Sequence, residues 1–200
     1  MTETFTPAFV AWPKTARLFR DITITEKIDG TNAAIHVDED GNVAAQSRNR
    51  IITPDADNYG FARWVHENAD SLHQILGSGL HFGEWWGHGI QRRYGMTEKR
   101  FSVFNTSKWT GEMRAGGDGE EHEEPVIRLR GGSISAVPVL YEGTFSEEEI
   151  TSALLSLKAY GSVAAPGFDN PEGICVYHSQ SRNVFKVTLD NYDASKWENA

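Results

Sequence analysis

Short β-prone segments separated by turn signals, with few helical stretches between them, constrain this chain more than any other feature of its sequence. Residues 23–27 and 33–37 are β-prone, and the sequence DEDGN that follows at 38–42 is typical of a hairpin turn. Strands and helices do not alternate regularly along the chain, which argues against a parallel α/β sheet. The sequence therefore predicts an α+β fold built on antiparallel sheets.

Two regions carry helical signals. Apolar residues recur at mixed helical spacings over residues 61–76, which predicts one or two helices. Another helix is expected over residues 146–160, because Ser146 and Glu149 form a capping box and Gly161 follows the last turn. The apolar stripe of this helix consists of Ile150, Ala153, Leu154 and Leu157. We interpret it as a packing element that carries no chemistry.

Size and composition are those of a globular protein with one domain. The chain has 200 residues, of which 39% are hydrophobic and 24% charged. A single cysteine, Cys175, excludes an intramolecular disulfide and favours a reducing compartment. The N-terminal sequence lacks a secretory signal, and no apolar run approaches the roughly 18 residues of a membrane span. We expect a cytoplasmic protein without membrane contact, with a mobile surface loop at residues 111–124.

The formal net charge of −9 excludes a protein whose whole surface is basic enough to bind nucleic acid without specificity. Basic residues do gather locally, in four pairs. These pairs are Arg48 and Arg50, Arg92 and Arg93, Lys99 and Arg100, and Arg128 and Arg130. Any phosphate-binding site is therefore confined to a local patch.

The sharpest motif is EKIDGTN at residues 26–32, which lies between two predicted strands. A lysine at the end of a strand, followed by a glycine turn, is a setting in which an amine can be held against a ligand. A free lysine amine has a pKa near 10.4, so it becomes a nucleophile only where nearby cations or burial lower that value. By itself the motif also fits a surface lysine beside a turn.

This motif resembles motif I, KxDGxN, of the covalent nucleotidyltransferases, the superfamily of ATP-dependent DNA ligases, RNA ligases and mRNA capping enzymes. Further segments resemble the later motifs in the same order. They are SRN at 47–49, HFGEWWG at 81–87, FSVFN at 101–105, EGICVY at 172–177 and VFKV at 184–187. The resemblance covers residues 26–186 and is strongest to the RNA ligases of the RNA-ligase-2-like type. It implies an ATP-grasp-like nucleotidyltransferase core of two antiparallel β-sheets flanked by helices.

The resemblance assigns the catalytic groups. Lys27 would attack the α-phosphate of ATP, expel pyrophosphate and hold AMP through a phosphoramide bond. Lys186, Arg48 and a bound metal ion would supply the positive charge that activates this amine and offsets the charge on the phosphate.

The resemblance also implies a nucleotide site made of Glu26, Asp29, Gly30, Asn32, Arg48, Glu84, Phe104 and Lys186. Glu84 would accept hydrogen bonds from the ribose hydroxyls, Phe104 would stack on adenine, and Glu26 would read the adenine amino group. Glu172 is a hard oxygen ligand for Mg²⁺ or Mn²⁺, and Asp29 or Asn32 would hold metal-bound water.

Packing alternatives remain open for several of these residues. Phe104 alternates with Val103 and could equally belong to the core. At least one of Trp85 and Trp86 is expected to pack inward, because neighbouring residues of a strand point to opposite faces. Cys175 lies between two aliphatic residues and is interpreted as a small buried side chain.

Two departures from the family pattern bear on function. Thr188 stands where the family usually carries a second lysine of motif V, which reduces the positive charge on the triphosphate and puts the later steps in doubt. Few residues follow motif V, so we expect a single nucleotidyltransferase domain over residues 1–200, without an OB-fold or C-terminal accessory domain.

The sequence thus predicts an ATP-dependent RNA ligase that joins RNA carrying a 5′-phosphate to a 3′-hydroxyl end, with ATP and Mg²⁺ or Mn²⁺. DNA ends, and a helper protein or accessory domain acting in trans, stay open. The alternatives are a small DNA ligase, an adenylyltransferase that stops before sealing, and a non-catalytic module that binds nucleotides or RNA ends.

Overall fold

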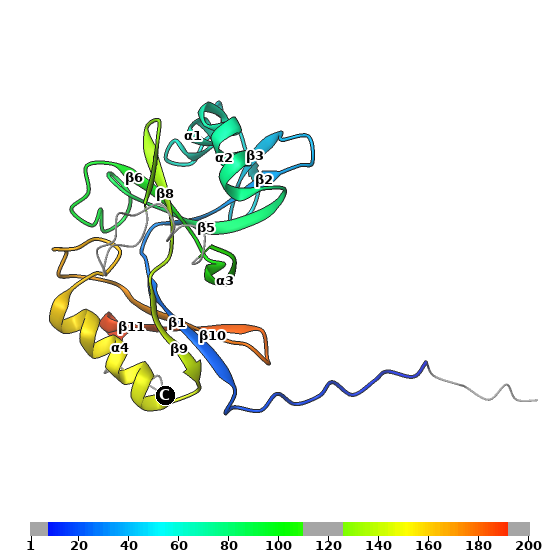
Figure 1. Ribbon diagram of the computed structural model, residues 1–200, viewed down its shortest axis with the longest axis vertical. Coiled ribbons are helices and arrows are strands. Elements are labelled where there is room, and N and C mark those ends of the chain that lie inside the picture. The colour runs from blue at the N-terminus through cyan, green and yellow to red at the C-terminus, as the bar shows by residue number, and fades with distance from the viewer. Residues whose placement is uncertain (1–7, 110–125, 192–200) are drawn as a thin grey trace, which may run out of the picture.

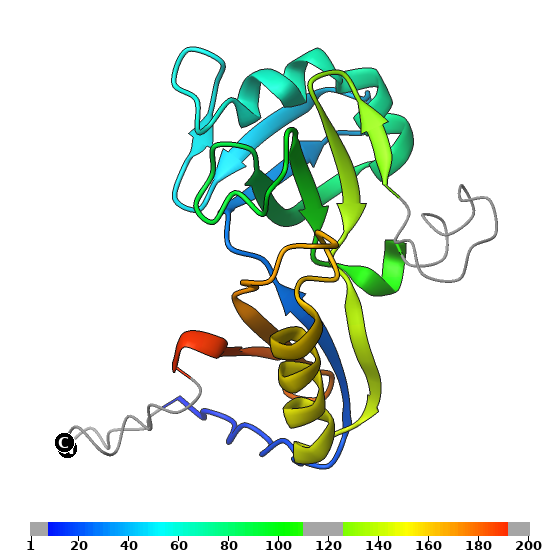
Figure 2. The same ribbon diagram turned by 90° about the vertical axis from the view of Figure 1, so that its left-hand side faces the viewer.

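A computed structural model describes residues 8–109 and 126–191 and contains two β-sheets that lie one above the other (Figures 1 and 2). The smaller sheet has four strands in the order β11-β10-β1-β9. The larger has seven, in the order β4-β3-β2-β5-β6-β8-β7. The segment 111–124, predicted to be a surface loop, lies outside the described residues. No helix in the described part of the chain is long and apolar enough to cross a membrane.

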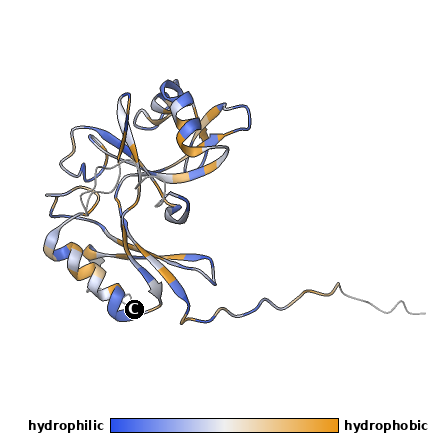
Figure 3. Ribbon diagram, viewed as in Figure 1, coloured by the Kyte–Doolittle hydropathy of each residue, from blue (hydrophilic) through white to orange (hydrophobic). Residues whose placement is uncertain are grey.

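The smaller sheet carries the long helix on one face only. Its strands are β1 (Asp21–Lys27), β9 (Val139–Thr144), β10 (Gly173–His178) and β11 (Asn183–Thr188), and the helix is α4 (Glu147–Tyr160). Polar and apolar residues alternate along β1 and β10, so each strand has one apolar face (Figure 3). The core between sheet and helix comprises Ile22, Ile24, Ile174, Val176, Ala153, Leu154 and Leu157. No helix covers the opposite face of this sheet in the described residues, and the predicted site residues Lys27 and Lys186 lie on that face.

The predicted helix over 146–160 is confirmed, together with its caps. Ser146 is the N-cap, and its Oγ accepts a hydrogen bond from the Glu149 amide at 3.3 Å. The helix ends at Gly161, whose φ of 83° lies in the left-handed region that glycine adopts without strain.

The larger sheet is covered by two short helices, α1 (Phe61–Glu67) and α2 (Ala69–Leu76), as the sequence predicted for residues 61–76. Its strands are β2 (Thr31–Val37), β3 (Val43–Ser47), β4 (Ile51–Ile52), β5 (Gly79–Gly87), β6 (Lys99–Val103), β7 (Ile127–Leu129) and β8 (Gly132–Ala136). A short helix, α3 (Thr106–Trp109), follows β6, and a 3-10 turn, η2 (Leu189–Asn191), follows β11.

Both tryptophans of β5 are packing residues. Trp85 lies in the core beneath α1, with ring centroids 4.9 Å from Trp64 and 5.3 Å from Phe61. Trp86 points to the other face, where it is fully buried and donates its Nε1 proton to Ser102 Oγ at 2.9 Å. Neither indole ring is left to contact a ligand.

The predicted α+β fold of two antiparallel sheets flanked by helices is confirmed, with one local difference. Strands β6 and β8 run parallel, while every other strand pair in the described residues is antiparallel. A parallel pair needs a crossover connection, and the long segment between β6 and β8, which includes α3 and β7, supplies one. Hairpin signals in the sequence do not reveal such a pairing.

Candidate active site

Lys27 and Lys186 lie on the uncovered face of the smaller sheet. The strand register pairs Lys27 with Gly173, Thr25 with Cys175, and Cys175 with Lys186. These residues therefore project from the face opposite α4, which in Figure 1 is the face turned towards the larger sheet. Strand pairing thus brings the two predicted catalytic lysines, 159 residues apart in the sequence, to one surface.

Glu172 is the direct partner of Lys27. The Lys27 Nζ and Glu172 Oε2 form an ion pair, and both side chains are mostly buried. Glu172 immediately precedes β10, whose first residue pairs with Lys27 across the sheet, so the contact follows from the register. Glu172, the first residue of motif IV, therefore contacts Lys27 of motif I. The resemblance implied that these two motifs contribute to one site.

Glu84 fixes the turn that follows Lys27. Its two carboxylate oxygens accept hydrogen bonds from the Gly30 amide and from Asn32 Nδ2, each at 3.1 Å. Burial raises the pKa of Glu84 to about 7, although the positive charge of Lys27 acts in the opposite direction. At neutral pH this carboxyl is thus divided between its charged and neutral forms.

Gly30 is required by packing. A Cβ atom at this position would lie 2.5 Å from the Trp85 carbonyl oxygen and 2.7 Å from Trp86 Cβ. The turn therefore lies against β5, and only glycine allows this close approach. The contact of Gly30 with the nucleotide stays a prediction.

Glu26 lies on the other face of β1, away from Lys27. It is 1% exposed, and its carboxylate accepts hydrogen bonds from Ser162 Oγ at 2.6 Å and from the Val163 and Ala164 amides at 2.8 Å. Burial raises its pKa despite these hydrogen bonds. The described contacts make Glu26 an anchor for residues 162–164, and its contact with adenine stays a prediction.

Phe104 is a surface aromatic residue and does not belong to the core. It is 43% exposed, and its amide donates to the Phe82 carbonyl at 2.9 Å, which extends the pairing of β5 and β6. Since Ser102 pairs with Glu84, Phe104 and Phe82 lie on the same face as Glu84. Phe82 is 53% exposed and was missed by sequence reasoning, although its spacing of two residues from Glu84 places it on that face.

The predicted cations Arg48 and Lys186 are exposed. Arg48 follows β3 directly, and the pairing of Ser47 with Ala33 puts it level with Asn32 at the end of the sheet nearest the Lys27 turn. Its side chain forms no hydrogen bond or ion pair with the residues that the structure describes. Both cations are therefore accessible to a phosphate, and their contact with one stays a prediction.

The three predicted metal ligands contact other side chains. Glu172 pairs with Lys27, Asn32 donates to Glu84, and Asp29 accepts a hydrogen bond from Arg92 Nε at 3.2 Å. No group of three His, Cys, Asp or Glu side chains gathers as a metal cluster in the described ranges. Mg²⁺ needs few protein ligands when substrate phosphates complete its shell, so carboxylates beside Lys27 fit that cation.

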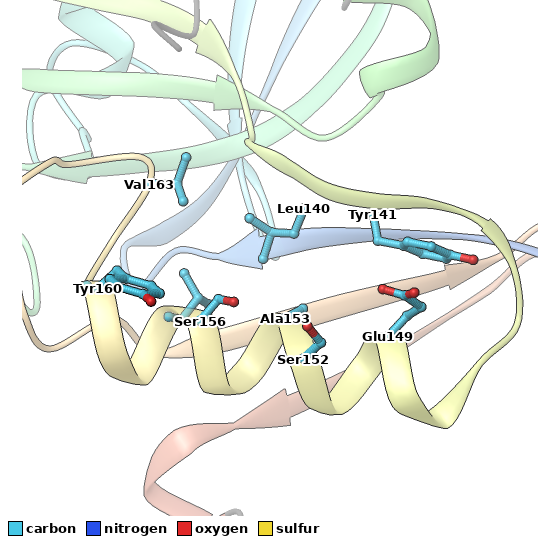
Figure 4. A pocket seen from close by; sticks show the side chains of 10 residues that line it. Leu140, Tyr141, Glu149, Ser152, Ala153, Ser156, Tyr160 and Val163 are labelled. Atoms are coloured by element: carbon cyan, nitrogen blue, oxygen red, sulfur yellow. The ribbon is translucent and has the colours of Figure 1, made fainter.

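A shallow groove elsewhere on the molecule does not belong to this site. It lies between α4 and β9, and Figure 4 shows Leu140 facing Ala153 and Tyr141 facing Glu149 across it. None of the predicted site residues lines the groove.

The two-sheet fold, with Lys27 and its partner Glu172 on the face turned towards the larger sheet, is the arrangement expected of a nucleotidyltransferase core. The family model described as RNA ligase matches residues 20–188, and the chain belongs to this RNA ligase family. A comparison with curated protein sequences finds no match.

Solved structures of RNA ligases from Naegleria gruberi have a similar fold. An apo variant of RNA ligase R4a superposes with a TM-score of 0.58 at 15% identity, covering 94% of this chain and 58% of the other. A variant described as bound to ATP and Mn gives 0.57 at 16% identity, covering 86% and 50%. A second such variant gives 0.57 at 15% identity, covering 96% and 60%. The chain thus spans about half to three fifths of these proteins.

Proposed function

We propose that this chain is the nucleotidyltransferase core of an ATP-dependent RNA ligase and that Lys27 carries AMP. The observation that carries the proposal is the contact of Lys27 with Glu172 on the uncovered sheet face, within the matched RNA ligase family. The similar Naegleria structures described as containing ATP or AMP with Mn support the use of ATP and a divalent metal.

In the first step, Lys27 Nζ attacks the α-phosphorus of ATP. A nitrogen–phosphorus bond forms, the bond to the β-phosphate oxygen breaks, and pyrophosphate leaves. The amine must lose its proton, and positive charge from Arg48, Lys186 and the bound metal ion would favour that loss. A bound Mg²⁺ or Mn²⁺, held through Glu172 and assisted by Asp29, would offset phosphate charge.

The nucleoside would be held by groups of the larger sheet. Phe104 presents an exposed ring for adenine, with Phe82 beside it. Glu84 keeps spare acceptor positions on each oxygen after its hydrogen bonds to Gly30 and Asn32, and these can bind the ribose hydroxyls. Arg48 and Lys186 would contact the phosphates.

The later steps move AMP to RNA and seal the strand. An oxygen of the RNA 5′-phosphate attacks the lysyl-AMP phosphorus, and the bond to Nζ breaks. A 3′-hydroxyl then attacks the activated 5′-phosphate, forming a phosphodiester and releasing AMP.

A second candidate function is an adenylyltransferase that stops before sealing. The residue that favours it is Thr188, which stands at the position of the second motif V lysine and removes one positive charge from the phosphate site. This candidate shares the first step and differs only after AMP is attached.

The proposal is tested by incubating the protein with α-labelled ATP and Mg²⁺ before denaturing electrophoresis. We expect wild-type protein to retain the label and Lys27→Arg to lose it, because arginine keeps the charge but does not deprotonate. Lys158→Arg, on the last turn of α4, is the matched control and should label normally. Label that persists in Lys27→Arg would contradict the assignment.

A nicked duplex with a labelled 5′-phosphate separates the two candidates. Joined product indicates a ligase, whereas accumulation of the AMP-capped 5′ end without product indicates an enzyme that stops. Nicked duplexes whose 3′-hydroxyl strand is RNA or DNA are then compared, which tests whether the enzyme prefers RNA or DNA ends.

A further inference from the structure

One arginine, Arg92 in the loop between β5 and β6, contacts three segments that flank the site. Its Nε donates to Asp29 Oδ2 at 3.2 Å, and its Nη2 donates to Asp190 Oδ2 at 2.5 Å. Its Nη1 donates to the Asn170 carbonyl oxygen at 3.2 Å and to Asn170 Oδ1 at 3.1 Å. Every nitrogen of the guanidinium group is engaged, and the side chain is 18% exposed.

The positions of these partners relate Arg92 to the chemistry. Asp29 lies two residues after Lys27, and Asn170 lies two residues before Glu172. Asp190 lies in η2, directly after β11. One side chain of the larger sheet's loop therefore connects the segments that bear the nucleophile and its acidic partner.

The same loop holds the Lys27 turn by a second, independent contact. The Asp29 amide donates to Tyr94 Oη at 2.8 Å. Tyr94 is buried, and its ring lies 5.0 Å from Trp86 and 4.7 Å from Phe168, measured between centroids. Arg92 thus fixes the side chain of Asp29, and Tyr94 fixes its backbone.

Backbone conformations of this loop are unfavourable without compensation. Gln91, Arg93 and Tyr94 have φ values of 42°, 61° and 50°, in the left-handed region. Such conformations are unfavourable for a non-glycine residue, so they persist only where surrounding contacts determine them. The hydrogen bonds of Arg92 and Tyr94 are contacts of this kind.

We propose that Arg92 is a positioning residue for the attachment of AMP to Lys27, an inference that rests on the proposed function. It acts by fixing Asp29 and Asn170, and through them the spacing between Lys27 and Glu172. An alternative role for this basic residue is direct binding of an RNA phosphate. That role would require Arg92 to release at least one of its three partner segments.

The test measures the rate of label attachment to Lys27 in a single turnover across an ATP series. We expect Arg92→Ala to lower the rate at saturating ATP at least about tenfold, while the ATP concentration for half-maximal rate changes less than about threefold. Arg92→Lys should not restore the rate, because an ammonium group cannot reproduce the planar fork. Arg93→Ala is the control, since the Arg93 side chain is exposed and should leave the rate unchanged.

Coupling between Arg92 and Asp29 is the sharper readout. In an Asp29→Ala background, Arg92→Ala should lower the rate less than it does in the wild type, because the contact between Arg92 and the Asp29 side chain is already absent there. The Asp190 side chain is 61% exposed, so Asp190→Ala should lower the rate less than Arg92→Ala does. It replaces Arg92→Ala in the test if that variant fails to fold. If the rate effects of Asp29→Ala and Arg92→Ala simply multiply in the double variant, the two residues act independently and the proposal is overturned.

Two further outcomes distinguish the possibilities. Normal AMP attachment by Arg92→Ala, with weakened RNA binding only, would identify Arg92 as a phosphate ligand and refute the positioning role. If wild-type protein attaches no AMP, the proposed function fails. Amide hydrogen exchange at residues 28–30, 170 and 172 then tests the positioning itself. Faster exchange in Arg92→Ala is expected, and unchanged exchange would refute the positioning role.

Discussion

Replacement of Glu26 tests whether this carboxylate is an anchor for residues 162–164. Glu26→Ala would leave Ser162 Oγ and the Val163 and Ala164 amides without the acceptor that they now share. Each buried donor left without an acceptor lowers the free energy of unfolding by roughly 1–3 kcal/mol. Part of this loss is offset because the variant no longer buries the Glu26 carboxylate. We expect the free energy of unfolding to fall by roughly 2–5 kcal/mol.

Glu26→Gln should behave differently. The two amides share Oε2 and the serine hydroxyl binds Oε1, so a glutamine oxygen can accept both amides while its Nε2 faces Ser162 Oγ. The change should therefore cost less than about 1 kcal/mol, at neutral pH. Because burial raises the pKa of Glu26, the folded protein keeps its proton to a higher pH than the unfolded chain. The contribution of Glu26 to the free energy of unfolding therefore decreases as the pH rises above 4.5 through the pKa of the folded state. Over that pH range, Glu26→Gln should become more stable relative to the wild type.

Urea unfolding followed by tryptophan fluorescence at several pH values measures both variants, with the exposed Glu39→Gln as control. The anchor role is refuted if Glu26→Ala costs less than about 1 kcal/mol, or if Glu26→Gln costs as much as alanine. A change in the preference for ATP over GTP in a fully stable Glu26→Gln protein would instead support the predicted contact with adenine.

Three other predictions concern the site. Because burial raises the pKa of Glu84 from 4.5 to about 7, the metal-free protein should lose about 3 kcal/mol of stability as the pH rises from 4.5 to 8, and Glu84→Gln should lose less in urea unfolding over the same range. Phe104→Ala should weaken ATP binding, measured by calorimetry, by about 1–3 kcal/mol, with Phe82→Ala having the smaller effect and neither recovering at higher Mg²⁺. Strand joining should decrease steeply with salt, since a net charge of −9 leaves few phosphate contacts, whereas label attachment to Lys27 should change little; equal salt dependence of both activities would contradict this.

Local signals made much of the fold predictable. Ser146, Glu149 and Gly161 mark the ends of α4 because caps depend on neighbouring residues only. The strands on either side of the Lys27 turn follow from their composition and from the turn itself. The parallel pairing of β6 with β8 depends on a long-range crossover, for which no local signal exists.

For the predicted site residues, the strand face that each occupies could be inferred from the sequence, but most of their contacts could not. Alternation along β1 puts Glu26 in phase with Ile22 and Ile24, so its burial opposite Lys27 could have been inferred. Its partners at residues 162–164 could not, because they are more than 130 residues away. The contacts of Arg92 are equally remote, joining Asp29, Asn170 and Asp190 across the two sheets.

The central claim is that the Lys27 amine becomes covalently linked to AMP. Mass spectrometry of protein digested after incubation with ATP and Mg²⁺, under conditions that preserve phosphoramide bonds, tests it directly. We predict that the added AMP is found on the peptide containing Lys27, that pyrophosphate removes it, and that it is absent from Lys27→Arg. AMP located on another residue, or an unmodified Lys27 in protein that still joins RNA ends, would contradict the claim.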